Sequence, residues 1–250
     1  MIHSFSFAAT SETGLVRKNN QDAFAVGEDI GLVVVADGMG GHRAGEVASR
    51  IAVETVHQVL ARENRDEQGN EMQTLLKLGA AVEKANEAIR RKAEYEPDMQ
   101  GMGTTIVAVL FRLKRVFVAH VGDSRLYRIR DGQIQQVTRD HSLIQQLLDA
   151  GTFQTTAQAE AAGIRNNVLT RGLGIEDKVE IDVADEPLEP GDLFLLCSDG
   201  LTNMVTDHDI KQIINHYKQD LDAAAERLML GALSAGGHDN ITLVLARPEL

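Results

Sequence analysis

Four aspartates in this sequence share one local setting. Each lies at one end of an apolar run and within two residues of a glycine. Asp37 follows the run LVVVA, and Asp199 follows LFLLCS. Asp123 follows FVAHVG, whereas Asp239 lies just before ITLVLA. We expect these runs to be buried strands, with glycines that let the backbone pack closely around the carboxylates.

A single Asp-Gly pair after a strand is most often a turn, because both residues dominate turns. Four such acids favour a second interpretation. Clustered carboxylates repel one another unless cations compensate their charge, and oxygen ligands suit hard divalent ions such as Mg²⁺ or Mn²⁺. The sequence has neither an HExxH motif nor paired cysteines, which would favour zinc. It therefore predicts a magnesium or manganese site.

Arg17 and Cys197 limit the kinds of reaction that the site could catalyse. Arg17 precedes another acid, Asp22, and a planar guanidinium can contact two phosphate oxygens, although a lone arginine is more often a surface residue. Cys197 lies in an apolar run, and residue 203 is Asn, so a phosphatase loop with a cysteine nucleophile is disfavoured. No GxxxxGK phosphate loop is present. Metal-assisted phosphate chemistry fits these residues best.

The composition limits the classes of partner. A formal net charge of −12 argues against binding to nucleic acid or to an anionic membrane. The single cysteine rules out an intramolecular disulfide and favours a reducing compartment. The opening residues do not resemble a signal peptide, and no apolar run reaches the roughly 18 residues of a membrane span. We expect a cytoplasmic monomer with a single domain spanning residues 1–250.

Periodicity predicts the elements that must position these acids. Apolar residues at spacings of three and four predict helices near 48–59, 75–89, 207–217 and 221–233. Nearly continuous apolar runs predict strands buried on both faces at 32–36, 116–121, 193–197 and 241–246.

The segment 127–137 reads as a hairpin with Asp131-Gly132 at its turn. Because hairpins pair strands antiparallel, we expect an α+β fold: a four-layer αββα sandwich of two antiparallel β-sheets flanked by α-helices. The segment 152–167 fits neither element and is predicted to be a mobile surface segment, in which 157–162 could form a helical turn.

These residues resemble the metal-dependent protein serine/threonine phosphatases of type 2C (the PPM family), in their bacterial form. The resemblance spans the chain nearly end to end and rests on seven landmarks in the family's order. The landmarks are RKNNQDA (17–23), DGMGGH (37–42), GTT (103–105), VGDSR (121–125), NVLTR (167–171), SDGL (198–201) and DN (239–240).

The resemblance implies hydrolysis of phosphoserine and phosphothreonine in proteins by a water that bridges two Mn²⁺ or Mg²⁺ ions. The protein substrates would be those of a bacterial serine/threonine kinase. Asp37 resembles the carboxylate that bridges the two ions, and Gly38 would lend its carbonyl to the second. Asp199 and Asp239 resemble ligands of the first ion. Asp22 resembles the acid near the second ion that acts through water.

The remaining family roles fall on three parts of the chain. Asp123 resembles a ligand of a third, weaker ion, and Arg17 resembles the arginine that binds phosphate. The segment 152–167 falls where the family has a flap beside the active site. Gln21 and Met39 depart from eukaryotic members, which have Glu and His at these positions. That His is a proposed general acid, so the proton donor is open.

Three candidates for the proton donor follow from the sequence. His42 and His120 lie near the acids, although a lone histidine is more often structural, and water bound to a metal ion could serve instead. Two rival functions are a phosphatase of small phosphorylated metabolites and a non-catalytic module that binds phosphoproteins. The second is disfavoured because the acids and Arg17 are all present.

Overall fold

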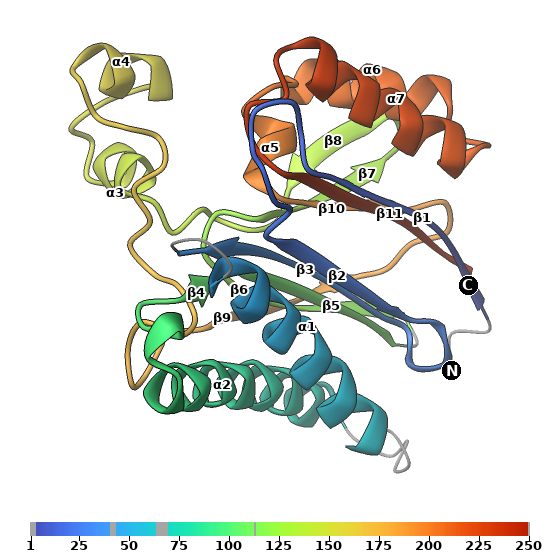
Figure 1. The fold of residues 1–250 in the computed structure, drawn as a ribbon. Coiled ribbons are helices and arrows are strands. Elements are labelled where there is room, and N and C mark those ends of the chain that lie inside the picture. Colours follow the sequence, from blue (N-terminus) through green and yellow to red (C-terminus); the bar gives the residue numbers. More distant parts are fainter. Residues whose placement is uncertain (1–3, 41–43, 64–69, 113, 250) are drawn as a thin grey trace.

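The computed structural model describes residues 4–40, 44–63, 70–112 and 114–249. Two antiparallel β-sheets lie face to face in it, and helices cover the outer face of each sheet (Figure 1). The predicted α+β, four-layer αββα sandwich is therefore confirmed. None of the helices in the described ranges combines the length and the apolar character that a membrane span requires.

The first sheet is covered by two helices from the C-terminal part of the chain, α6 (Asp207–His216) and α7 (Leu221–Ser234). Its strands run in the order β1-β11-β10-β7-β8. Their bounds are β1 Ser4–Glu12, β7 Arg125–Arg130, β8 Gln133–Gln136, β10 Leu193–Cys197 and β11 Ile241–Glu249. The β7-β8 hairpin turns at Asp131 (φ 50°) and Gly132 (φ 72°), as the sequence predicts.

The second sheet is covered by α1 (Ala44–Glu63) and α2 (Glu71–Tyr95). Its strands run in the order β2-β3-β5-β6-β9, and β4 pairs with β3. Their bounds are β2 Asp22–Gly27, β3 Leu32–Met39, β4 Gly103–Thr104, β5 Ile106–Arg112, β6 Arg115–Val121 and β9 Asp182–Pro187. Two short 3₁₀ helices, η1 (Glu28–Ile30) and η2 (Pro97–Met99), complete this half.

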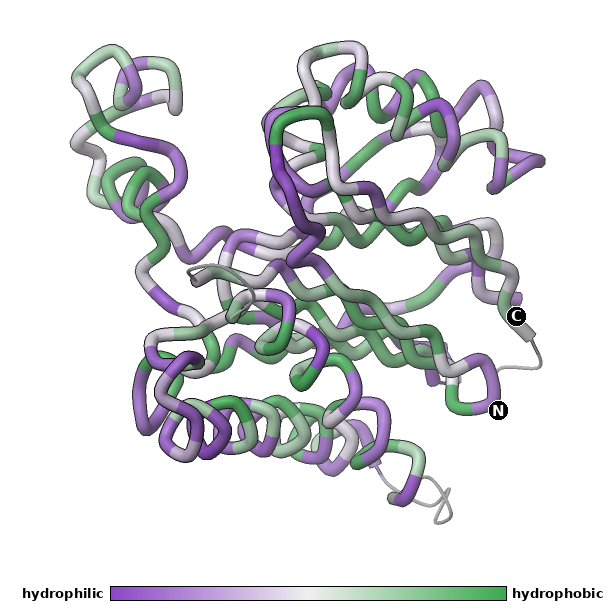
Figure 2. The backbone as a smooth tube through the Cα atoms, viewed as in Figure 1, coloured by the Kyte–Doolittle hydropathy of each residue, from purple (hydrophilic) through white to green (hydrophobic). Residues whose placement is uncertain are grey.

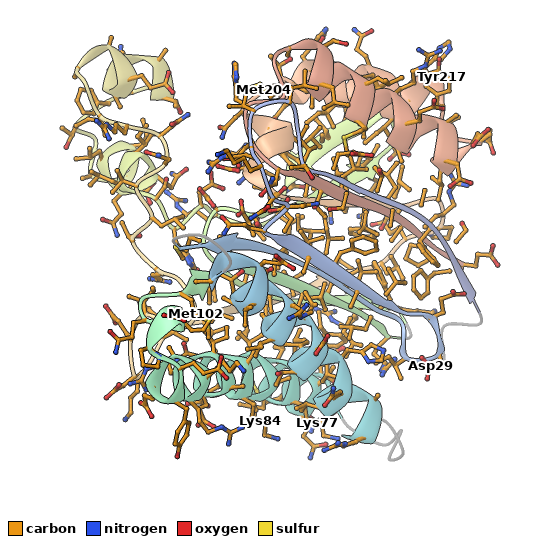
Figure 3. The ribbon with its side chains drawn as sticks, viewed as in Figure 1. Asp29, Lys77, Lys84, Met102, Met204 and Tyr217 are labelled. Carbon is orange, nitrogen blue, oxygen red and sulfur yellow. The ribbon has the colours of Figure 1, made fainter. Side chains whose placement is uncertain are left out.

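Strand β3 shows why the apolar runs are continuous. Leu32, Val34 and Ala36 pack toward α1 and α2, whereas Val33 and Val35 pack toward the first sheet. Both faces of β3 are therefore buried, and the central strands of the sandwich are mostly coloured as hydrophobic in Figure 2. Side chains fill the space between the layers, while Lys77 and Lys84 of α2 point away from the sheet (Figure 3).

A helical excursion projects from the sandwich between β8 and β9 (Figure 1). It carries α3 (Leu143–Asp149) and α4 (Thr156–Ala161), and α4 matches the helical turn predicted in this region. A bridge between Ser142 and Leu169 ties its two ends together. We call residues 143–168 the flap.

Candidate metal centre

The predicted acids meet at one edge of the sandwich. Asp22 begins β2 directly opposite Asp37 on β3, and Asp199 begins α5 (Asp199–Thr202) just after β10. Residues of the site line a cleft of about 200 Å³, and Asp22 lies buried beside it. The cleft is lined in part by Arg17, Asp37, Gly38, Asp123, Asp199 and Asp239.

Neutral side chains fix the backbone of Asp37. Its N–H donates to Thr105 Oγ1 (3.0 Å), and its carbonyl accepts from Thr104 Oγ1 (2.8 Å) and from the Thr105 N–H (2.9 Å). The next residue, Gly38, packs against α1 so closely that a Cβ there would lie 2.1 Å from the Gly45 carbonyl oxygen. Glycine is therefore required at position 38.

Two carboxylate oxygens at this edge are buried without a hydrogen-bond partner among the described residues: Asp22 Oδ1 and Asp199 Oδ1. The other oxygen of each acid is satisfied. Ser198 Oγ donates to Asp22 Oδ2 (2.7 Å), and Asn203 Nδ2 donates to Asp199 Oδ2 (3.1 Å). Buried acceptors are rarely left unpaired, and oxygen ligands suit hard divalent cations. The residues present therefore fit a divalent metal site.

Burial and mutual repulsion raise the pKa values of these acids. Desolvation, followed by weaker influences that include nearby carboxylates, raises the pKa of Asp22 to about 6 and that of Asp123 to about 7. The pKa of Asp37 is raised well above its ordinary value, first by burial and then by Asp22, Asp199, Asp123 and Asp239. Burial also raises the pKa of Asp199. The group cannot ionise fully near neutral pH without added positive charge.

Arg17 supplies one cation at the rim of the cleft. Its Nη2 donates to Asp239 Oδ2 at 2.7 Å, and its side chain is 52% exposed. The two departures from the eukaryotic pattern, Gln21 and Met39, also line the cleft. The thioether of Met39 offers no titratable proton.

The structure places His120 away from the cleft. Its Nε2 contacts the Arg139 carbonyl (2.9 Å), and its ring stacks on His141 at 4.7 Å. His141 in turn approaches Asp182 (3.3 Å), and Arg171 contacts both of these residues. His120 is therefore not placed to donate a proton to a substrate in the cleft. His42 lies outside the described residues.

Three polar residues at the site received no role from the sequence, namely Thr105, Ser198 and Asn240. Each belongs to one of the sequence landmarks GTT, SDGL and DN. Their place in these landmarks was the signal by which the sequence could have identified them. The contact that each residue makes depends on strand pairing, which the sequence does not show.

A second cleft of about 250 Å³ adjoins the first and shares Asp123 and Asp199 with it. The flap forms one wall of this second cleft, through residues that include Ile144, Leu148, Thr156 and Glu160. The two clefts together connect the flap to the acid cluster.

The metal-free protein should lose stability as pH rises from about 4 to about 7. Because the folded-state pKa values of Asp22 and Asp123 exceed those of unfolded carboxyls, the folded state binds more protons in this window. The shift of Asp22 alone corresponds to roughly 3 kcal/mol. Urea unfolding in excess chelator, at about pH 5 and about pH 7.5, measures the effect.

Asp22→Asn provides the matched control for this measurement. The amide keeps the shape of the side chain but does not titrate, so the loss of stability between the two pH values should shrink. A metal-free protein that gains stability over the same window would contradict the raised pKa values.

Comparison with known proteins places this geometry in a family. The sequence matches the family described as protein phosphatase 2C over residues 16–233. It is 41% identical over 240 residues to the serine/threonine protein phosphatase PstP of Mycobacterium tuberculosis, an alignment that covers 96% of this chain and 44% of PstP. This chain therefore spans less than half the length of that relative.

Two further comparisons cover nearly the full length of both partners. The chain is 39% identical over 243 residues to the serine/threonine phosphatase stp of Listeria monocytogenes, which covers 96% of this chain and 94% of stp. A crystal structure of the PstP catalytic domain in complex with two manganese ions gives a TM-score of 0.83, at 41% identity over 97% of each chain. Sequence and fold agree, and the chain belongs to the protein phosphatase 2C family.

Proposed function

We propose that this chain is a metal-dependent phosphatase that hydrolyses phosphoserine and phosphothreonine in proteins. The observation that carries the proposal is a pair of buried carboxylate oxygens, on Asp22 and Asp199, that find no hydrogen-bond partner in the described part of the chain and lie at a cleft rimmed by Arg17. The relatives named above are serine/threonine phosphatases, and one of their structures holds two manganese ions. Proteins phosphorylated by a bacterial serine/threonine kinase are the proposed substrates.

Each residue of the cluster has a proposed part in this function. Asp37 and Gly38, with Asp199 and Asp239, would hold two Mn²⁺ or Mg²⁺ ions, and Asp22 would act near the second through water. Such ions lower the pKa of water to near neutrality, which permits in-line attack on phosphorus, and they offset charge on the phosphate.

The protein itself would orient the phosphate. Arg17 holds Asp239 through Nη2 while its side chain stays half exposed, so the rest of its planar fork can face a phosphate. The threonines that hold the backbone of Asp37 and the serine on Asp22 keep the acids in place before substrate arrives. A cytoplasmic location and a monomeric state stay predictions from the sequence.

Hydrolysis of phosphoserine and phosphothreonine peptides should require added Mn²⁺ or Mg²⁺ and should stop in excess chelator. Asp37→Asn should abolish turnover while the protein stays folded, because the proposed bridge between two ions is lost. Phosphate release, elemental analysis and circular dichroism check these outcomes. Undiminished turnover by metal-free protein would refute the metal mechanism. A preference for small phosphorylated metabolites over phosphopeptides would favour the alternative function of a metabolite phosphatase.

Asp123 tests whether a third, weaker ion takes part. If it holds such an ion, Asp123→Ala should keep two tightly bound ions but lose most of its kcat. Because the pKa of Asp123 is raised in the fold, its removal should not lower the melting temperature of the metal-free protein.

The alternative role for Asp123 is to cap the turn between β6 and β7. A cap would lower stability by about 1 kcal/mol and leave turnover per folded molecule unchanged. Metal stoichiometry, melting temperature and kcat of this one variant distinguish the two roles.

The flap is proposed to select protein substrates. It forms a wall of the cleft next to the acids, and this position suits contacts with residues that flank the phosphorylated one. We therefore treat 1–250 as one catalytic unit, with the segment 152–167 inside the flap as its recognition element.

Replacing Thr156 and Glu160 by Ala should reduce turnover of phosphopeptides more than turnover of an aryl phosphate, which is too small to reach the flap. Gln154→Ala, on the same segment but outside the cleft lining, is the matched control. Steady-state kinetics on both substrates measure the difference. Equal losses on the two substrates would argue against a role in recognition.

A further inference from the structure

The loop between β1 and β2 carries Arg17, and a single side chain ties together both ends of this loop. Asn240 Nδ2 donates to the carbonyls of Thr13 and Asn19, each at 2.9 Å. Asn240 Oδ1 accepts from the Gln21 N–H at 2.8 Å. One amide thus uses both donor hydrogens and an acceptor oxygen on three points of the segment 13–21, which we call the Arg17 loop.

We call the Asn240 side chain with its three hydrogen bonds the clamp. It is buried, and its pattern of two donors and one acceptor requires an amide. Asn240 is 4% exposed, so water cannot readily replace its partners. An aspartate at this position would face two carbonyl oxygens without a proton to donate, and an alanine would leave three backbone groups unpaired.

The Arg17 loop also packs directly against the segment that carries Asp239. Gly14 has a φ of +79°, and a Cβ there would lie 2.2 Å from the Asp239 carbonyl oxygen. The Leu15 N–H donates to the Gly237 carbonyl at 2.7 Å. These contacts fix residues 14 and 15 against the backbone of the segment 237–239, while Asn240 holds the two ends of the loop.

Arg17 depends on this backbone for its position. Its side chain is 52% exposed, and its guanidinium reaches Asp239 through Nη2. A long, half-exposed side chain has many rotamers. The position of the Arg17 Cα therefore determines what fraction of them place the guanidinium at the phosphate site.

We propose that Asn240 is a positioning residue: its side-chain amide holds the Arg17 loop so that the guanidinium faces the phosphate of the substrate. This inference rests on the proposed function for its kinetic consequence, but the clamp itself can be tested without turnover. The amide acts through Arg17 and touches no reacting atom.

The chain offers a closely matched control in Asn86, on α2. Asn86 is 1% exposed and makes the same kind of clamp on another loop. Its Oδ1 accepts from the Gly174 N–H (2.6 Å), and its Nδ2 donates to the carbonyls of Glu176 (3.0 Å) and Asp177 (3.4 Å). Asn86→Ala therefore removes an equivalent set of hydrogen bonds without touching the Arg17 loop.

Hydrogen exchange of the metal-free protein tests the clamp alone. Asn240→Ala should speed amide exchange in residues 13–21 by about tenfold or more, and Asn86→Ala should instead speed exchange in residues 174–177. Asn240→Ser, which keeps a small polar group, should give a smaller effect and serves if the alanine variant does not fold. Unchanged exchange in the Arg17 loop would overturn the clamp, whether or not the protein is a phosphatase.

Kinetics on an aryl phosphate at saturating Mn²⁺ test the positioning role. Asn240→Ala should raise KM by about tenfold, with a smaller loss of kcat, because loop displacement weakens phosphate binding. In an Arg17→Ala background the same substitution should change KM by less than about twofold, since the residue through which it acts is absent.

Two kinetic outcomes would overturn the proposal. One is a full effect of Asn240→Ala in the Arg17→Ala background, which would mean that Asn240 acts on the acids or on the fold at large. The other is an equal rise in KM for Asn86→Ala, which would reduce both effects to general destabilisation. A wild-type protein without turnover, but with the predicted exchange pattern, would refute the phosphatase proposal and leave the clamp intact.

Discussion

The burial of several neighbouring carboxylates at one edge of the sandwich is the constraint on which the site depends. Desolvation is the largest cause of the raised pKa of Asp37, and four neighbouring aspartates add to it. The fold holds these acids together although they destabilise one another near neutral pH. The apolar layer between the sheets and the two helical layers must therefore supply the stability that the acid edge does not.

Strand alternation explains how the acids come together. On β3, Val33 and Val35 face the other sheet, and Asp37 continues the same face two residues before the strand ends at Met39. Asp22 lies directly opposite Asp37 in an antiparallel pair, so the two carboxylates share that face. In the other sheet, the paired residues Leu196 and Val244 pack inward. Toward the acid edge the same alternation continues with the buried polar residues Ser198, Thr242 and Asn240. The central layer thus changes from apolar to polar at one edge.

The sequence predicted much of this, and the reasons for the remainder are physical. Continuous apolar runs predicted four strands that are buried on both faces, and the acids near their ends predicted the acid cluster that the fold assembles. Strands β1, β2, β4, β5 and β9 were not predicted. For β9 the reason is that DVADEP is an acidic edge strand whose signal is weak. The contact of Ser198 with Asp22 joins residues 176 positions apart, and only the pairing of the strands reveals it. His120 lies close to the acids in the sequence, yet its side chain on β6 stacks on His141 and not on a residue of the cleft.

Elsewhere in the same chain, buried acids are neutralised by arginine. Asp192 is 1% exposed, and Arg130 holds both of its oxygens at 2.7 Å. Arg125 binds Asp140 in a similar bidentate pair. At the acid edge, by contrast, the neutral hydroxyl of Ser198 holds the carboxylate of Asp22, and Thr104 and Thr105 hold the backbone of Asp37. None of these contacts cancels the charge of a carboxylate. An arginine at these positions would satisfy the acids and occupy the place of a cation. The chemistry of the site therefore depends on which buried acids the fold leaves without a positive partner.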